Sequence, residues 1–217
     1  MSKKKEAAQN IDVATDEPQE LGTEHYDDVY RRGGWEQIYF KNPFDVPIYS
    51  ELWSSVAFEI LQSEDANQIT DMGCGPGHLP YILRSAGIEQ PYTGYDFSKV
   101  AIQMAEMRQL PDCTFINKNL YDMGDLPVSL FTCLEVLEHI EKDLELVAQI
   151  PTGCRLLFSV PTYDSHGHVR KFKDHEEVSE RYGEMFDLEF IDEIFVRYTE
   201  DEDPIEHKIF LFSGIRK

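Results

Sequence analysis

The sequence predicts a single α/β domain with a mostly parallel sheet and helices on both faces. Three observations support this prediction. Short apolar segments of strand length recur along the chain, and stretches with helical spacing separate them. One such segment leads into a helical stretch through a turn that contains three glycines. The chain of 217 residues can bury one full core, and single α/β domains of this length are common.

The glycine-rich turn ends the first predicted strand and reads Ile69-Thr-Asp-Met-Gly-Cys-Gly-Pro-Gly77. Gly73, Gly75 and Gly77 can adopt positive φ angles and let a ligand approach the backbone. Nucleotide-type ligands bind at such turns, outside the carboxyl ends of parallel strands. The spacing differs from the G-x-G-x-x-G pattern that seats a pyrophosphate, and Asp71 would repel a phosphate but attract an ammonium group. The turn therefore predicts a ligand with an amino group, or else a simple turn without a ligand.

The second predicted strand, residues 92–96, ends in Asp96. A carboxylate at this position can accept hydrogen bonds from both hydroxyl groups of a ribose. Ser98 is a plausible N-cap for the helix that follows, because apolar residues between Val100 and Ala105 recur at helical spacing. We therefore expect Asp96 to bind a ribose.

Three further strands are predicted at residues 113–117, 130–134 and 155–160. Asn119 and Leu120 follow the first of these strands, where an adenine is expected to lie. Asn119 also suits an ordinary turn, so its role stays open.

The order of these motifs resembles that of the class I S-adenosylmethionine-dependent methyltransferases. The motifs that carry the resemblance are Asp71-Met-Gly-Cys-Gly-Pro-Gly77, Gly94-Tyr-Asp96, Cys133-Leu-Glu-Val-Leu-Glu-His139 and Phe158-Ser-Val-Pro161. The resemblance covers about residues 50–217 and implies a Rossmann-like sheet of seven strands. Residues 186–196 and 207–213 would supply the last two strands as an antiparallel hairpin at the sheet edge, joined by the acidic turn 199–204.

The resemblance implies that S-adenosylmethionine is the cofactor. In the family, the backbone around Gly73 and Gly75 holds the methionine portion, Asp71 supports its ammonium group, and Asp96 binds the ribose. By the same resemblance, the other cofactor-binding residues are expected to be Cys74, Gly77, Phe97, Asn119, Leu120, Leu134 and Glu135. The positive sulfonium and amine of this cofactor also suit a chain with a net charge of −21.

His139 is the candidate catalytic base. It lies in the segment Glu135-Val-Leu-Glu-His139, after the fourth predicted strand, where a methyltransferase presents its reactive groups. Methyl transfer requires mainly alignment of the acceptor and removal of its proton, and an imidazole can take that proton near neutral pH. The alternative is a structural histidine at a helix start, oriented by Glu138 or Glu135.

A divalent metal is an alternative use of the same segment. Glu135, Glu138 and His139 offer two carboxylates and an imidazole, and His168 or His166 would complete the set. The small-RNA 3′-end 2′-O-methyltransferases use a similar Glu-x-x-Glu-His element with a downstream histidine. The same string occurs in metal-free relatives, such as the ubiquinone-pathway O-methyltransferases. We therefore expect no metal.

The methyl acceptor is expected to be a hydroxyl group of a small molecule or sugar, with an amine less favoured. The Asn-Pro-Pro-Tyr element of amino-directed DNA methyltransferases is absent, since the local sequence is Val160-Pro-Thr-Tyr163. The residues expected to contact the acceptor are Tyr39, Tyr49, Tyr163, His166, His168 and Arg170. Two other functions stay open: metal-assisted 2′-O-methylation of RNA, and regulation by a non-catalytic protein that binds S-adenosylmethionine.

Composition limits the partners. Binding to nucleic acid depends on lysines and arginines, and this acidic chain has no long basic stripe, so a nucleic-acid partner is disfavoured. The short patch Arg170-Lys-Phe-Lys173 could meet an anionic group of the substrate or could be a solvated loop. No apolar run is long enough to span a bilayer, and no signal peptide is visible. Membrane association is therefore not expected.

Four cysteines, Cys74, Cys113, Cys133 and Cys154, lie in or beside predicted strands or the glycine turn. Their positions predict small buried side chains, not a disulfide framework, which indicates a reducing, cytoplasmic environment. Residues 1–25 are polar and predict a disordered tail, and residues 26–217 predict one domain. The resemblance implies that residues 26–61 form a lid over the cofactor, with a helix predicted from about Ser50, and that residues 62–217 form the core. The aromatic lid candidates are Tyr39, Phe40, Phe44 and Tyr49.

Overall fold

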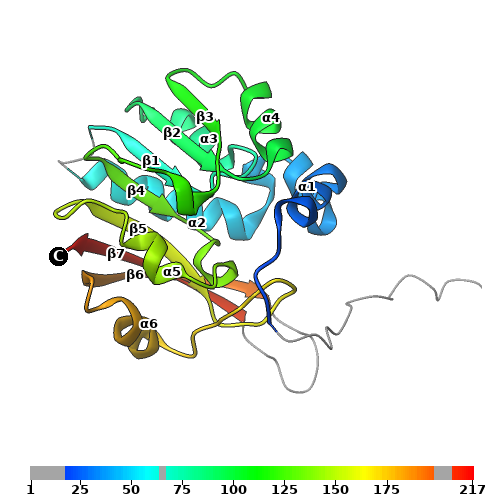
Figure 1. Ribbon diagram of the computed structural model, residues 1–217. Coiled ribbons are helices and arrows are strands. Elements are labelled where there is room, and N and C mark those ends of the chain that lie inside the picture. The colour runs from blue at the N-terminus through cyan, green and yellow to red at the C-terminus, as the bar shows by residue number, and fades with distance from the viewer. Residues whose placement is uncertain (1–17, 64–66, 198–206) are drawn as a thin grey trace, which may run out of the picture.

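Seven strands form one sheet in the computed structural model, which describes residues 18–63, 67–197 and 207–217. They are β1 (Ile69–Met72), β2 (Tyr92–Asp96), β3 (Cys113–Asn117), β4 (Leu130–Cys133), β5 (Arg155–Pro161), β6 (Phe186–Arg197) and β7 (His207–Arg216). Their spatial order is β3-β2-β1-β4-β5-β7-β6 (Figure 1). The first five strands pair in parallel, and β7 pairs antiparallel with both β5 and β6. This arrangement confirms the predicted Rossmann-like sheet with its antiparallel C-terminal hairpin.

The predicted strands agree closely with the observed ones, although only some of them are buried along their whole length. Strands β2 and β3 begin and end where the sequence predicts, whereas β4 ends one residue earlier and β5 continues to Pro161. All residues of β1 and β4 are buried, as expected for strands that are covered on both faces. The predicted turn at residues 199–204 lies outside the described residues.

The helices and 3₁₀ turns either precede β1 or lie in the connections between strands. The helices are α1 (Thr23–Arg32), α2 (Pro47–Gln62), α3 (His78–Ser85), α4 (Lys99–Met107), α5 (Asp143–Val147) and α6 (His175–Tyr182). The 3₁₀ turns are η1 (Trp35–Phe40), η2 (Pro43–Asp45), η3 (Leu120–Asp122) and η4 (Leu137–His139). The predicted N-cap of α4 is confirmed, since the Ala101 amide donates to Ser98 Oγ at 3.1 Å. Helix α2 begins at Pro47, earlier than predicted, because proline is favoured at the first helical position.

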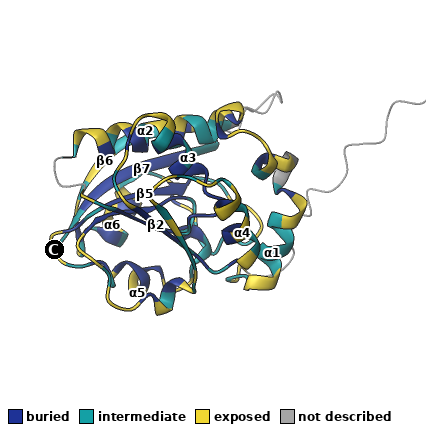
Figure 2. Cartoon of the chain, turned by 90° about the horizontal axis from the view of Figure 1, so that it is seen from above, coloured by how far each residue is buried: buried dark blue, intermediate teal, exposed yellow. Residues whose placement is uncertain are grey.

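The sheet separates two hydrophobic cores. Alternate side chains of the strands pack on one side with α2 and α3, as Leu52 and Leu83 do. The other side packs with α5 and α6 through residues such as Leu146 and Tyr182. Figure 2 shows α2 and α3 on one side of the sheet and α5 on the opposite side. The carboxyl ends of β1, β2 and β4 are therefore held at one edge between two packed layers.

Helix α1 corrects the extent of the predicted tail. The sequence predicts disorder over residues 1–25, but α1 begins at Thr23, and of these residues the structure describes those from 18 onward. Asp27 holds this helix against α4, because its carboxylate accepts hydrogen bonds from Ser98 Oγ at 2.6 Å and the Val100 amide at 3.3 Å. Such polar docking leaves little apolar periodicity in the sequence.

Among the described residues, no helix is both long and apolar enough to cross a membrane. Cys74, Cys133 and Cys154 are buried and Cys113 is half-buried, and all four are free thiols. The predicted burial of the cysteines is therefore confirmed for three of them.

Candidate active site

A cavity of about 140 Å³ lies at the carboxyl ends of β1, β2 and β4. Residues from the glycine turn, the strand ends and the N-terminal segment line it together. All but one of the residues that the sequence assigns to cofactor binding are in this lining: Asp71, Gly73, Cys74, Gly75, Asp96, Phe97, Asn119, Leu120, Leu134 and Glu135. The exception is Gly77, whose added Cβ would lie 3.1 Å from Ala105 Cβ of α4. Gly77 therefore serves the packing of two helices, and its predicted contact with the cofactor has no support in the cavity lining.

The glycine turn adopts the predicted backbone conformation. Gly73, Gly75 and Gly77 have φ angles of 90°, 51° and 72°. A Cβ on Gly73 would lie only 2.3 Å from Val136 Cγ2. Glycine is therefore required here both by the positive φ and by the close approach of the segment after β4.

Asp96 is oriented by two backbone amides. Its Oδ2 accepts a hydrogen bond from Gly75 at 3.0 Å, and its Oδ1 accepts one from Ser98 at 2.8 Å. Burial raises the pKa of Asp96 to about 6, although these two hydrogen bonds oppose the rise. Each oxygen keeps a lone pair for a further donor, so the carboxylate can accept from two neighbouring hydroxyl groups.

Asp71 lines the cavity, but its hydrogen bonds are internal. Its carboxylate accepts from the hydroxyl of Tyr92 on β2 and from Thr132 Oγ1 on β4, the latter at 2.7 Å. Burial raises its pKa to about 6. Asp71 therefore ties β1 to both neighbouring strands, and its predicted contact with an ammonium group stays a prediction.

Glu135 is held by β5 in an unusual backbone conformation. Its φ is 55°, its amide donates to Ser159 Oγ at 2.8 Å, and Ser159 Oγ donates back to its Oε1 at 2.8 Å. Burial and the charge of Glu138 raise the pKa of Glu135 well above its usual range. This residue brings an acid without a charged partner to the cavity wall, where a cationic ligand would stabilise its ionised form.

His139 also lines the cavity and has a defined tautomer. Its Nδ1 lies 2.9 Å from the Gly167 carbonyl oxygen, which can only accept, so Nδ1 carries the proton and Nε2 is unprotonated. Burial lowers the pKa of His139, and the hydrogen bond to Gly167 opposes this shift. The side chain is therefore neutral and able to accept a proton at Nε2 around neutral pH.

Glu138, His139 and His168 converge, whereas Glu135, which the metal hypothesis also includes, is not part of this cluster of described residues. One ligand atom from each of the three lies within 4.8 Å of the others, and the rings of His139 and His168 are 4.7 Å apart. Glu138 is fully buried, burial raises its pKa, and neither carboxylate oxygen has a hydrogen-bond partner among the described residues. An orphaned buried carboxylate beside two imidazoles fits a divalent cation.

The sequence profile of a family described as a methyltransferase domain matches residues 49–198. The chain belongs to this family. The match confirms the resemblance to the class I S-adenosylmethionine-dependent methyltransferases that the motifs indicate. Among curated proteins, the comparison finds no match to this methyltransferase.

Solved structures share the fold at low sequence identity. The magnesium protoporphyrin IX methyltransferase of Synechocystis PCC 6803, solved with S-adenosylhomocysteine, has a TM-score of 0.63 and 18% identity over 90% of this chain and 95% of its own. The N-methyltransferase NodS of Bradyrhizobium japonicum WM9, also solved with S-adenosylhomocysteine, has a TM-score of 0.62 and 17% identity, with 88% and 97% covered. The methyltransferase domain of bacterial CtHen1 has a TM-score of 0.53 and 20% identity, with 78% and 100% covered.

More aromatic side chains line the cavity than the sequence predicts. Tyr39 and Tyr49 line it as expected, whereas Phe40 and Phe44 are exposed and do not. The aromatic lining residues that sequence reasoning missed are Tyr26, Tyr30, Trp53 and His78. Tyr26 and Tyr30 are four residues apart, which places them on one face of α1, but this signal is weak in a polar segment.

The predicted acceptor residues after β5 lie outside the cavity lining. Tyr163 stacks on His207 with ring centroids 4.8 Å apart, and His168 Nδ1 lies 3.1 Å from the Tyr163 carbonyl oxygen. His166 is exposed and faces His25 of α1 at 5.1 Å. Their contact with an acceptor stays a prediction, and only His168 has a direct ring contact with His139.

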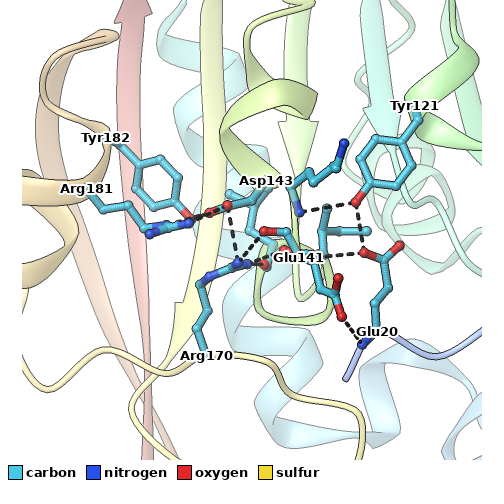
Figure 3. Close-up of polar contacts among 10 residues, drawn as sticks. Glu20, Tyr121, Glu141, Asp143, Arg170, Arg181 and Tyr182 are labelled. Carbon is cyan, nitrogen blue, oxygen red and sulfur yellow. Dashed lines mark hydrogen bonds and ion pairs between the residues drawn. The ribbon is translucent and has the colours of Figure 1, made fainter. Parts of the chain in front are cut away.

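Arg170 has a structural position that contradicts its predicted role. It donates hydrogen bonds to the carbonyl oxygens of Leu137, Ile140 and Glu141, and its Nη2 lies 3.3 Å from Asp143 (Figure 3). Asp143 is fully buried and also accepts from Arg181 at 2.6 and 2.7 Å and from Tyr182 at 2.7 Å. Arg170 therefore fixes the segment that carries His139. Lys171 and Lys173 of the same basic patch pair with Asp164 and Asp174.

The N-terminal segment is fastened across the cavity by a latch of Glu20, Glu141 and Tyr121. The Glu141 amide donates to Glu20 Oε2 at 2.8 Å, and the Glu20 amide donates to Glu141 Oε1 at 3.2 Å. The Tyr121 hydroxyl also donates to Glu20 Oε2 at 2.8 Å (Figure 3). Since Glu20 and Leu21 line the cavity, this latch places residues 20–30 over it.

Proposed function

We propose that this methyltransferase transfers the methyl group of S-adenosylmethionine to a hydroxyl group of a small molecule or sugar, with His139 as the base. When bound, the cofactor supplies a methyl carbon activated by positive sulfur. The observation that supports a hydroxyl acceptor is the neutral His139 at the cavity wall, with Nε2 available to accept a proton. A hydroxyl must lose its proton during transfer, so a positioned base is useful for it.

The cofactor contacts are assigned from the polar groups of the cavity. Asp96 accepts from the ribose hydroxyls, and the backbone of Gly73 and Gly75 lies against the methionine portion. Glu135 offers the carboxylate that a cationic group can approach. The four free cysteines support a reducing, cytoplasmic setting for this chemistry.

The cofactor site is tested by calorimetric titration with S-adenosylmethionine and S-adenosylhomocysteine. Asp96→Ala should weaken both ligands by more than about tenfold, because it removes a charged acceptor of two hydrogen bonds. Asp125→Ala, which removes an exposed acid elsewhere, should leave binding unchanged. If the unaltered protein binds neither ligand, the proposal is wrong.

The acceptor class is tested by measuring S-adenosylhomocysteine release with panels of sugars, phenols and amines. Hydroxyl compounds should be turned over, and His139→Ala should lower kcat by roughly 10²- to 10⁴-fold while cofactor binding persists. His175→Ala is the matched control, since His175 lies on α6 outside the cavity lining. Turnover of amines alone, with kcat unaffected by His139→Ala, would contradict the proposal.

Metal-assisted 2′-O-methylation of RNA is the second candidate. The convergence of Glu138, His139 and His168 and the orphaned carboxylate of Glu138 favour it. A divalent cation held there would polarise a hydroxyl acceptor. The net charge of −21 is against it, because RNA phosphates require cationic contacts.

Chelation distinguishes the two candidates because His139 cannot be a base at Nε2 and a metal ligand at the same atom. For the metal mechanism, EDTA should abolish turnover, Mg²⁺ or Mn²⁺ should restore it, and His168→Ala should be inactive. For the metal-free mechanism, EDTA should have no effect, and His168→Ala should retain measurable turnover.

A further inference from the structure

The charges in the cofactor cavity are unbalanced. The amino-acid end of S-adenosylmethionine carries an ammonium group and a carboxylate. Four acids line the cavity, Glu20, Asp71, Asp96 and Glu135, and no lysine or arginine of the described residues does. The ammonium group of the ligand therefore has several acidic partners there, but the carboxylate of the ligand has no lysine or arginine to pair with. The ligand carboxylate must instead be bound by neutral donors, such as hydroxyl, imidazole or backbone N–H groups.

His78 is an unpartnered buried side chain at this site. It is the first residue of α3, directly after the glycine turn, and it is 2% exposed. Neither ring nitrogen has a hydrogen-bond partner among the described residues, and the side chain lines the cavity. A buried imidazole N–H without an acceptor is unfavourable, so the position fits a ligand that completes it.

The electrostatic surroundings of His78 differ from those of the neighbouring Tyr30 and Tyr39. Burial and the charge of Arg108 together lower the pKa of His78 to about 3, and the backbone of Tyr39 opposes this shift. No carboxylate contributes to this pKa, whereas Asp96 acts on both Tyr30 and Tyr39. The N-terminus of α3 adds free N–H groups and positive potential. This corner of the cavity therefore suits an anion.

Two tyrosines extend the corner toward the glycine turn. The Tyr39 ring lies 6.1 Å from that of His78, and the Tyr30 ring lies 4.8 Å from that of Tyr39. The Tyr30 hydroxyl is 3.2 Å from the position that a Cβ on Gly75 would take. Burial raises the pKa of both phenols, so they stay neutral donors.

We propose that His78, together with the hydroxyl groups of Tyr30 and Tyr39, binds the α-carboxylate of the cofactor's methionine portion. The proposal rests on S-adenosylmethionine being the ligand of this cavity. The ammonium group then lies toward the acids at the strand ends, and the carboxylate lies toward the start of α3. Recognition by neutral donors distinguishes this site from one that uses an arginine or a lysine.

Calorimetry with S-adenosylmethionine and its decarboxylated form tests the proposal, since the two ligands differ only by the carboxylate. Without a receptor for the carboxylate, the acidic cavity should prefer the decarboxylated ligand, which is more positive. With the receptor, the unaltered protein should prefer S-adenosylmethionine by roughly tenfold or more. Which of the two ligands the unaltered protein binds more tightly therefore already tests the proposal, before any substitution is made.

His78→Phe removes the donor while filling most of the volume. It should weaken S-adenosylmethionine roughly tenfold and leave the decarboxylated ligand within about twofold, so that the preference is lost. His78→Gln, which keeps an N–H donor, should retain most of the preference, and Tyr39→Phe should reduce it. His175→Ala is the control that changes neither ligand.

Two outcomes separate the hypotheses. Equal weakening of both ligands by His78→Phe, or a wild-type preference for the decarboxylated ligand, would overturn the role of His78. Absence of binding of either ligand to the unaltered protein would instead overturn S-adenosylmethionine as the cofactor. Thermal unfolding of each variant without ligand shows whether it is folded, and Tyr39→Phe carries the test if His78→Phe is not.

Discussion

Gly73 illustrates how a single position can be fixed by backbone and neighbour together. We predict that Gly73→Ala weakens cofactor binding at least tenfold and lowers the free energy of unfolding by about 1–3 kcal/mol, because φ is 90° and Val136 is 2.3 Å from the new Cβ. Gly153→Ala is the matched control, since φ is 83° with nothing within 4 Å. Gly153→Ala should lower the free energy of unfolding without changing the affinity for the cofactor. Calorimetry and urea denaturation measure both quantities, and unaltered affinity in Gly73→Ala would contradict the prediction.

Sequence reasoning at the residue scale works where backbone geometry determines the residue type. Asp96 follows the end of a clear strand, and the glycine turn has few other uses, so both are found from the sequence. His78 and Tyr30 are missed because a histidine or tyrosine in a helix usually indicates packing. Arg170 is misassigned because its partner Asp143 lies 27 positions away, and the sequence does not show that the two meet.

At the scale of elements, the N-terminal segment lines the cavity and is held in place by the latch of Glu20, Glu141 and Tyr121. We predict that Glu20→Ala raises the dissociation rate of S-adenosylmethionine about three- to tenfold, because it removes two hydrogen bonds of the latch. Stopped-flow displacement with excess S-adenosylhomocysteine measures this rate. Glu24→Ala removes an equal charge from an exposed position of α1 and serves as the control. Equal rates for the two variants would show that the latch does not restrain the cofactor.

The elements differ in how well the sequence predicts them. Strands β1 and β4 are buried along their whole length, whereas β2 alternates and β3 has no buried residue, so apolar runs alone do not predict all the parallel strands. Helix α1 is a mostly polar segment held by contacts such as Asp27 with Ser98 and by the rings of Tyr26 and Tyr30, so the sequence does not reveal it as a helix of the fold. The lid was expected from resemblance alone, and its latch depends on residues about 100 and 121 positions apart.

The whole molecule carries a large negative charge together with buried acids, and its stability should therefore depend on pH. Burial raises the pKa of Asp71 and Asp96 to about 6, so the folded state binds their protons more tightly than the unfolded state. The contribution of these two carboxyls to the free energy of unfolding is complete below about pH 3.8, their pKa in the unfolded chain, and is lost as the pH rises through about 6. At about 1.4 kcal/mol per pKa unit, the two carboxyls together account for a loss of a few kcal/mol by pH 7.5.

Urea denaturation of the ligand-free protein between pH 4 and 7 at fixed ionic strength measures this dependence. Asp71→Asn should flatten the slope, because it removes one of the two titrating groups. Salt should raise stability by screening the net charge of −21, with little effect on the buried carboxyls. A free energy of unfolding that rises from pH 5 to pH 7 would contradict the assignment.

The conformation and surroundings of Glu135 lower the stability of the folded chain. Glycine adopts a φ of 55° without strain, whereas any other residue at this position lowers the stability of the fold by on the order of 1–3 kcal/mol. The chain nevertheless carries an acid at that point, buried beside a second acid. Both the positive φ of a non-glycine residue and the placement of two acids side by side lower the stability of the fold. A sequence selected for stability alone would contain neither feature. Consensus or stabilising redesign of this protein should therefore leave position 135 untouched, since the most obvious improvement would remove the carboxylate from the cavity.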